Sequence, residues 1–528
     1  MAQGYVALVL HAHLPFVRHP EFPRFMEEDW LFEAITETYL PLLEVMEGLE
    51  RDGVPFRLTM SLTPPLIAML TDELLQKRYE AYLDARIELA TNEMRRLRGS
   101  KEFYPLAEMY YGIFVRSRHR FTEQYGRNLV QAFRRFQDSG QLQILTCGAT
   151  HGLLPLLQDR TIQRAQIHVA VEQYRRHFDR DPVGIWLPEC AYVPGLDELL
   201  AEYGIRFFFL ETIGILRADP PPVYGVYAPL YTPSGVAAFG RDPESSAQVW
   251  SKDSGYPGDY DYREFYRDIG FDLPLEYVGP YLHDRNVRHM LGIKYYRITG
   301  KTDEKATYHP GWARQKAELH AGNFLFNRTK QIEWLAQHMD RPPIVVAPYD
   351  AELFGHWWFE GPQFLDFFIR KVHREQDVVE LITPAEYLDR HPVNQVAVPE
   401  ISSWGANGTF EVWCNGTNDW IWPHLHQAGR RMKELAHRYP QAEGLLRRAL
   451  NQAARELLLA QSSDWPFIMT MGTTVEYAVR RFRSHIARFT KLYEDIRNGE
   501  IDEPWLQEIE RRDNIFPEID YSIYRWTD

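Results

Sequence analysis

The chain has 528 residues, of which 73 are acidic and 59 basic, so its formal net charge is −14. This balance argues against a nucleic-acid or anionic-membrane surface and suits a neutral partner such as a sugar polymer. The length favours about two to three domains, although one barrel can take about 250 residues or more. Three cysteines without C-x-x-C spacing exclude a disulfide framework and a zinc ribbon, and they indicate a reducing compartment.

The N-terminal segment lacks the features of a targeting signal. No basic stretch precedes its apolar run, which is too short for a signal peptide and runs into histidines. No other stretch approaches the roughly 20 apolar residues of a membrane span. We therefore expect a cytoplasmic protein without a membrane or nucleic-acid partner, as a monomer or small homo-oligomer.

Short apolar runs of strand length recur along the chain, and most are followed by a turn and a helix-patterned segment. Such β/α alternation predicts an α/β fold with a parallel sheet. The runs cover residues 5–10, 56–62, 142–147, 183–187, 205–210, 344–347 and 378–382.

Three segments depart from this alternation. Residues 72–138 are charged and helix-patterned, too long for a single crossover, and predict a helical insertion. Residues 239–270 are rich in Asp, Gly, Ser and Tyr and predict a long loop over the active face. From about residue 399 an aromatic, Gly-rich stretch leads into helical patterns. We therefore expect a catalytic unit over 1–398 and a helical C-terminal domain over 399–528.

Polar side chains follow three of the apolar runs directly. His11 and His13 end the first run, Glu189 follows the fourth, and Asp350 follows the sixth. In a parallel α/β barrel the carboxyl ends of the strands form the catalytic face. Two carboxyl groups among aromatics, delivered from different strands, are what the splitting of a glycosidic bond requires.

The segments around these residues resemble glycoside hydrolase family 57, and within it the 1,4-α-glucan branching enzymes. The resemblance implies a (β/α)7 barrel with a C-terminal helical domain, acting on α-glucans without a metal or organic cofactor. The matching stretches, in the family's order along the chain, are His11–Pro15, Gly148–Gly152, Trp186–Tyr192, Tyr349–Trp358 and Ser462–Phe467.

The resemblance also implies the roles of the two carboxyl groups. Glu189 matches the family's nucleophile, although a strand-end Glu can also cap a helix or form an ion pair. Asp350 matches the general acid/base, and aromatic neighbours such as Tyr349 and Trp357 would limit its hydration and raise its pKa. Glu352 competes locally for that role, because alternation along the strand points it to the same side.

Three histidines admit more than one interpretation. The resemblance favours His11, His13 and His151 as groups that bind sugar hydroxyls beside the cleaved bond. As metal ligands they would instead resemble a zinc hydrolase with a carboxylate completing the site. Ordinary buried histidines with satisfied hydrogen bonds are the third possibility.

Further substrate contacts follow from the resemblance alone. Trp186 could equally fill the barrel, and Arg267 could take the place of Arg263 one helical turn away. The residues expected to contact the glucan are Trp186, Arg263, Gly279 through its backbone, Trp404, Trp413 and Asp464.

The expected activity is that of a retaining 1,4-α-glucan branching enzyme of glycogen- or starch-type metabolism. Two departures from the branching pattern exist: residues 239–246 contain no tyrosine, and a glutamine expected near Thr473 is replaced. An α-amylase or 4-α-glucanotransferase of the same family is the main alternative. A metal-dependent carbohydrate hydrolase and a non-catalytic glucan-binding protein are the alternatives outside the family.

Overall fold

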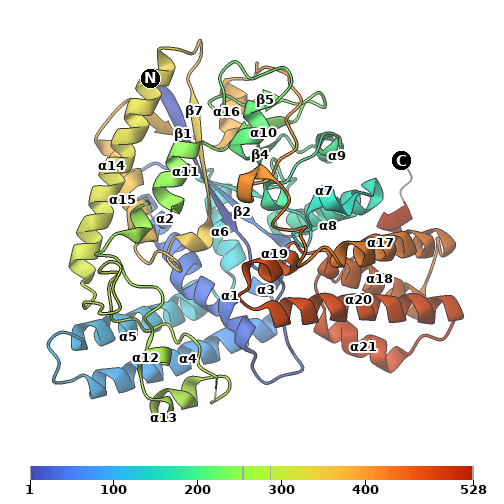
Figure 1. The fold of residues 1–528 in the computed structure, drawn as a ribbon, viewed down its shortest axis with the longest axis horizontal. Coiled ribbons are helices and arrows are strands. Elements are labelled where there is room, and N and C mark those ends of the chain that lie inside the picture. The colour runs from blue at the N-terminus through green and yellow to red at the C-terminus, as the bar shows by residue number, and fades with distance from the viewer. Residues whose placement is uncertain (1, 252–254, 286, 526–528) are drawn as a thin grey trace.

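Strand β1 (Gly4–Ala12) lies at the centre of the parallel sheet in the computed structural model, which describes residues 2–251, 255–285 and 287–525 (Figure 1). It pairs in parallel with β2 (Leu58–Leu62) and β7 (Ile344–Asp350), and its first residues pair with β8 (Val379–Leu381). All nine of its residues are buried. A strand covered on both faces needs a continuous apolar run, which is why this segment is visible in the sequence.

Of the remaining strands, β3 (Leu142–Leu145), β4 (Phe207–Leu210) and β6 (Ala237–Gly240) pair in parallel, and β5 (Leu230–Tyr231) pairs with β6 antiparallel. β3 pairs with β2, and a second sheet has the order β4-β6-β5. Parallel bridges from Thr146 to Ile185 and from Gly184 to Phe207 join the two sheets. The parallel α/β core is thus confirmed, whereas the count of seven barrel strands stays a prediction.

Two segments differ from the sequence-based expectation. Residues 183–187, expected as a strand, form isolated parallel bridges at Gly184 and Ile185 and no strand. The segment expected to be a loop over 239–270 begins inside β6 and continues into α11 (Pro243–Trp250) and, later, α12 (Ile269–Asp272). β6 has the sequence Ala-Ala-Phe-Gly, too short and small to stand out as an apolar run. Helix α11 begins where the Asp242 side chain accepts a hydrogen bond from Ser245 N, as an N-cap does. Residues 252–254 of this segment lie outside the described ranges.

The segment 72–138 is helical, as its pattern predicts. It contains α4 (Glu73–Arg96), α5 (Tyr104–His119) and α6 (Leu129–Asp138). Helices α4 and α5 pack side by side, away from the strands (Figure 1). The other helices of the first 400 residues are α1 (Asp29–Ala34), α2 (Leu40–Arg51), α3 (Pro64–Leu70), α7 (Leu154–Leu157), α8 (Arg160–Phe178), α9 (Leu196–Glu202), α10 (Thr212–Leu216), α13 (Leu275–Val278), α14 (Pro310–Ala336), α15 (Gly361–Arg374) and α16 (Pro384–Arg390).

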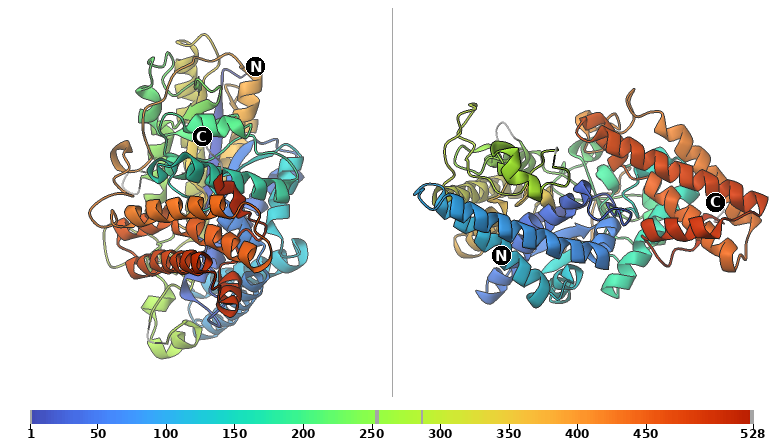
Figure 2. Two further views of the ribbon diagram at one scale, coloured as in Figure 1. Left: turned by 90° about the vertical axis from the view of Figure 1, so that its right-hand side faces the viewer. Right: turned by 90° about the horizontal axis from the view of Figure 1, so that it is seen from below.

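The C-terminal segment is helical and gathers at one end of the molecule, drawn in orange and red in Figures 1 and 2. Helix α18, almost wholly buried over its second half, packs against α20 and forms the centre of this group. None of the helices in the described ranges has the length and apolar character needed to cross a membrane. The helices are α17 (Ile421–Arg438), α18 (Gly444–Ala460), α19 (Asp464–Met471), α20 (Val475–Asn498) and α21 (Glu503–Arg512).

Candidate active site

The predicted catalytic residues converge where the parallel strands end. The β1–β7 register places His11 directly beside Asp350. Glu189 follows the strand-like segment that bridges β3 and β4, in a tight turn at φ 62°, and His151 also has a positive φ, of 59°. Left-handed backbone at residues other than glycine typically costs about 1–3 kcal/mol and is common at functional sites. The backbone conformation of this turn therefore fixes the direction in which the Glu189 side chain points.

The carboxylate of Glu189 is held at both oxygens. Ser463 Oγ donates a hydrogen bond to Oε1 at 2.8 Å, and Trp404 Nε1 donates one to Oε2 at 2.9 Å. Burial raises the pKa of Glu189, while these two donors act in the opposite direction. The donors stabilise the ionised form, which is the form of a nucleophile.

Asp350 lies in a different electrostatic environment. Burial, together with the negative charges of Glu352 and Glu189, raises the pKa of Asp350 to about 8. Within the described ranges, no group donates a hydrogen bond to its carboxyl. Asp350 is therefore protonated at neutral pH and available to a substrate, as a general acid requires.

Glu352, the local competitor, is engaged with the protein. Tyr39 donates a hydrogen bond to its Oε1, and the backbone N of His13 donates to the same oxygen at 3.3 Å. Burial raises the pKa of Glu352 to about 7. Its orientation is set by these contacts, so Asp350 is the better candidate for the proton donor.

The imidazoles of His11 and His151 form a neutral pair. His11 Nδ1 lies 2.6 Å from Ser61 Oγ, and His11 Nε2 lies 3.0 Å from His151 Nε2. His151 Nδ1 in turn lies 2.7 Å from Ser463 Oγ. Burial, and then the neighbouring histidines, lower the pKa of both rings well below the ordinary value. Neutral imidazoles of this kind can both donate to and accept from sugar hydroxyls.

His13 forms an ion pair with Asp464 of the C-terminal segment. Its Nε2 lies 3.0 Å from Asp464 Oδ2, and its Nδ1 lies 3.0 Å from Thr63 Oγ1. Burial alone would lower the pKa of His13, but Asp464 more than offsets it and the net shift is upward. Burial likewise acts to raise the pKa of Asp464, but His13 lowers it to about 2. The pair is charged and ties the two parts of the chain together.

The residues that could hold a metal ion differ from the predicted set of His11, His13 and His151. Ligand atoms of His13, His151 and Asp464 lie within 4.8 Å of one another, a set of two imidazoles and one carboxylate that zinc can use. His11, one of the three predicted ligands, is not in this set. His13 Nε2 lies near both Asp464 oxygens, at 3.2 and 3.0 Å, the arrangement of an ion pair.

Two of the tryptophans expected to contact the glucan are buried: this corrects the expectation for Trp413 and supports the alternative of a barrel filler for Trp186. Trp186 is 0% exposed and stacks on the protein side of His11, with ring centroids 4.7 Å apart. Trp413 is 1% exposed, and a Cβ at Gly405 would lie 2.6 Å from its ring. Neither ring presents a face to a ligand, so Trp186 is a barrel filler and Trp413 a core residue of the C-terminal part.

Trp404 is only partly buried and lies beside the nucleophile. Its ring is 6.4 Å from that of Trp250, which is 47% exposed. Trp250 was not among the predicted contacts, although it lies in the segment that resembles branching enzymes. Trp250 is thus a neighbour of the ring that bonds the nucleophile.

Arg263 and Gly279 lie in the segment between α11 and α14. Arg263 is 4% exposed, its Nη1 lies 3.2 Å from Glu37 Oε1, and its guanidinium covers the ring of Phe359 at 4.0 Å. These contacts engage the guanidinium group of Arg263, and its contact with substrate stays a prediction. Arg267 pairs with Asp272 at 2.9 Å. Gly279 is buried at the start of a short turn after α13, and its contact with sugar stays a prediction.

Sequence reasoning missed several polar residues that complete the pocket. The β1–β2 register pairs His11 with Ser61, and Thr63 continues the same alternation. This polar pair at the end of an apolar strand was a usable signal. No such signal marks Ser463 or Tyr39 in the sequence, because the residues that they contact are distant in the chain.

Comparisons with known proteins agree with this geometry. A family described as glycosyl hydrolase family 57 matches residues 7–401, and one described as 1,4-alpha-glucan branching enzyme, C-terminal, matches residues 424–524. A 1,4-alpha-glucan branching enzyme of Thermococcus kodakarensis is 35% identical over 99% of this chain and 78% of its own length.

Solved structures of high similarity carry two different activity names. The α-amylase AmyC from Thermotoga maritima superposes with a TM-score of 0.93 at 46% identity, covering 99% of both chains. A family 57 branching enzyme from Pyrococcus horikoshii superposes with a TM-score of 0.90 at 33% identity, covering 100% of this chain and 97% of its own.

Proposed function

The chain belongs to glycoside hydrolase family 57, and within that family we propose that it acts as a 1,4-α-glucan branching enzyme with a retaining mechanism. The observation that carries the catalytic part is the contrast between two buried carboxyl groups. Glu189 accepts hydrogen bonds from Ser463 and Trp404, which favour its ionised form. Asp350 lacks such donors in the described ranges, and its pKa is about 8. A pair with opposed environments divides into nucleophile and acid.

The reaction then proceeds in two steps. Glu189 attacks the anomeric carbon of an α-1,4-linked glucose unit while Asp350 protonates the leaving glycosidic oxygen, so that a glycosyl ester forms on Glu189. In the second step the ionised Asp350 accepts the proton of an incoming C6 hydroxyl, and that oxygen displaces Glu189. The product is an α-1,6 branch with the anomeric configuration retained.

The surrounding residues support glucan binding. His11 and His151 are neutral and offer donors and acceptors for hydroxyls next to the cleaved bond. Trp404 and the exposed Trp250 offer aromatic faces on which a sugar ring can stack. A matched C-terminal branching-enzyme region and the branching relative at 35% identity support transfer over hydrolysis. We place the activity in glycogen- or starch-type metabolism in the cytoplasm.

An α-amylase of the same family is the second candidate, because AmyC is 46% identical to this chain. Hydrolysis needs the same two carboxyl groups, and differs only in whether water or a C6 hydroxyl meets the glycosyl ester. The absence of a tyrosine in residues 239–246 bears on this point, since that segment resembles the branching enzymes' loop.

Incubation with amylose tests the proposal directly. We expect the product to contain linkages that isoamylase cleaves, and the released chains to give a defined length distribution. The Glu189→Gln variant is the control for contaminating activities. If the enzyme produces only new reducing ends, with no isoamylase-sensitive linkages, the α-amylase assignment replaces the branching assignment.

A further inference from the structure

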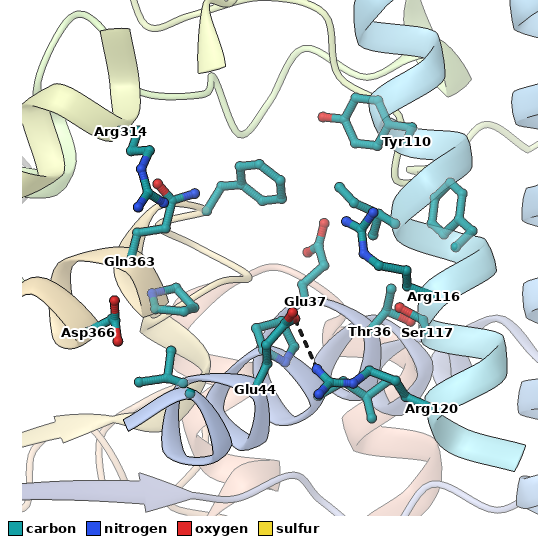
Figure 3. A pocket seen from close by; sticks show the side chains of 18 of the residues that line it. Thr36, Glu37, Glu44, Tyr110, Arg116, Ser117, Arg120, Arg314, Gln363 and Asp366 are labelled. Atoms are coloured by element: carbon teal, nitrogen blue, oxygen red, sulfur yellow. Dashed lines mark ion pairs between the residues drawn. The ribbon is translucent and has the colours of Figure 1, made fainter. Parts of the chain in front are cut away.

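A cavity of about 550 Å³ lies between α2, α5 and α15, apart from the catalytic pocket. Within the described chain, its lining contains none of the residues assigned above to catalysis or to the histidine cluster. The volume is in the range of small-molecule sites in proteins. Figure 3 shows Arg314 and Gln363 on one side of it and Arg116 and Arg120 on the other.

The lining is basic, although the whole chain has a net charge of −14. Five arginines face three carboxylates, and the carboxylates have partners of their own. Glu37 contacts Arg263 and His356, Glu44 pairs with Arg120 at 3.1 Å, and Asp366 pairs with Arg370 at 2.9 Å. The arginines of the lining are Arg51, Arg116, Arg120, Arg314 and Arg370.

The guanidinium groups of Arg116 and Arg314 differ from the other three in their partners, and that of Arg314 lies 4.9 Å from the centre of the Phe367 ring. Arg51 and Arg370 both lie near Asp52, at 3.3 and 2.8 Å. In contrast, no carboxylate in the described part of the chain lies within 4.0 Å of Arg116 or Arg314. Both are exposed, so a ligand reaches them without a change in the fold.

We propose that this cavity binds the phosphate group of a small phosphate ester, such as a phosphorylated sugar, between Arg116 and Arg314. Guanidinium groups bind phosphate oxygens through paired N–H donors. The amide of Gln363 and the hydroxyls of Thr36 and Ser117 line the same space and can bond sugar hydroxyls, while Phe359 supplies an apolar wall. No aromatic ring among the described lining residues is strongly exposed, which disfavours a glucan-stacking role.

Calorimetric titration of the full chain with inorganic phosphate, glucose 6-phosphate and glucose tests the proposal. We expect the phosphate compounds to bind at one site, with an affinity that falls as salt rises. Arg116→Gln and Arg314→Gln should each weaken binding about tenfold or more. Arg98→Gln, an exposed arginine outside the cavity, is the matched control and should leave the affinity unchanged.

The relative affinities identify the source of the phosphate group. Tighter binding of glucose 6-phosphate indicates a phosphorylated sugar, and equal binding of inorganic phosphate indicates the free anion; both support the site. Absence of binding by either phosphate compound overturns the proposal. So does equal affinity in wild type and both cavity variants, or an equal loss in Arg98→Gln. The titration measures phosphate binding without glucan turnover. A failure of this proposal can therefore be distinguished from a failure of the catalytic assignment.

Discussion

Ser463 Oγ donates a hydrogen bond to Glu189 Oε1 at 2.8 Å, although the two residues are 274 positions apart in the chain. Ser463 stands at the turn before α19, and its hydroxyl also contacts His151 Nδ1 at 2.7 Å. The C-terminal segment therefore orients the nucleophile of the barrel. It also supplies Asp464 to His13 and Trp404 to Glu189, so several contacts join the parts of the active site.

Replacement of Ser463 by alanine should lower activity without removing a reacting group. A hydrogen bond to a charged acceptor is typically worth about 1.5–3 kcal/mol, so we expect kcat/KM to fall about 10- to 100-fold. Loss of the donor destabilises ionised Glu189 and raises its pKa, which moves the acid limb of the pH–activity profile to higher pH. Ser463→Thr keeps a hydroxyl and should retain the wild-type profile. An unchanged acid limb in Ser463→Ala would contradict this role.

Glu189→Gln tests the nucleophile itself. The variant keeps the shape of the side chain and cannot form the glycosyl ester, so turnover should fall by several orders of magnitude. Affinity electrophoresis in glucan gels should show that binding survives. Near-normal turnover of amylose by the purified variant would exclude the mechanism.

If Asp350 is the general acid, activity should fall at high pH. With a pKa of about 8, the carboxyl is protonated below that pH and ionised above it. The rate of glycosidic cleavage should therefore decline as pH rises through about 8. Asp350→Asn should be much less impaired on an aryl α-glucoside, whose leaving group needs little protonation, than on amylose. Equal losses on both substrates would point away from general acid catalysis.

The raised pKa of Asp350 also predicts the direction in which the free energy of unfolding changes with pH. Its pKa is higher in the folded than in the unfolded chain, so unfolding releases a proton between about pH 4 and 8 and stability falls as pH rises through that window. Asp350→Asn removes this contribution. In thermal unfolding, the stability of the variant relative to wild type should therefore be higher at pH 8 than at pH 4. A difference that is independent of pH would refute the raised pKa of Asp350.

Mutation of Trp413 should affect the stability of the fold, and mutation of Trp250 should affect glucan binding. Trp413 is 1% exposed, so Trp413→Ala leaves a cavity and should destabilise the fold by about 3–5 kcal/mol. Trp250 is 47% exposed, so Trp250→Ala should leave the melting temperature nearly unchanged. It should weaken glucan binding and lower branching more than hydrolysis. Circular dichroism melts and the amylose assay on both variants separate the two roles.

Chelation distinguishes the sugar-binding from the metal interpretation of His13, His151 and Asp464. If His13 and Asp464 form the charged pair described above, prolonged treatment with a chelator should leave activity intact. Metal analysis of the purified protein accompanies the assay. Stoichiometric zinc, together with loss of activity on chelation, would favour a metal-dependent hydrolase.

The sequence by itself determined the strands and the residues at their ends. β1 and β7 are buried on both faces, so they appear as apolar runs, and the first polar residues after these runs, including His11 and Asp350, lie at the carboxyl ends of the strands. The helical character of the C-terminal segment was likewise predicted from its pattern, although not the position of every helix. Strand β6 was not, because four small or aromatic residues leave no such pattern.

Only the tertiary structure decided what each of these residues contacts. Trp186, Trp413 and Trp404 look alike in sequence, yet two are buried and one bonds the nucleophile, because burial depends on which segments pack around the ring. The pairing of Arg263 with Glu37, 226 positions away, could not be read from the sequence either. Hydrogen bonds that orient Glu189 come from residues more than 200 positions away, and local pattern carries no information about such pairings.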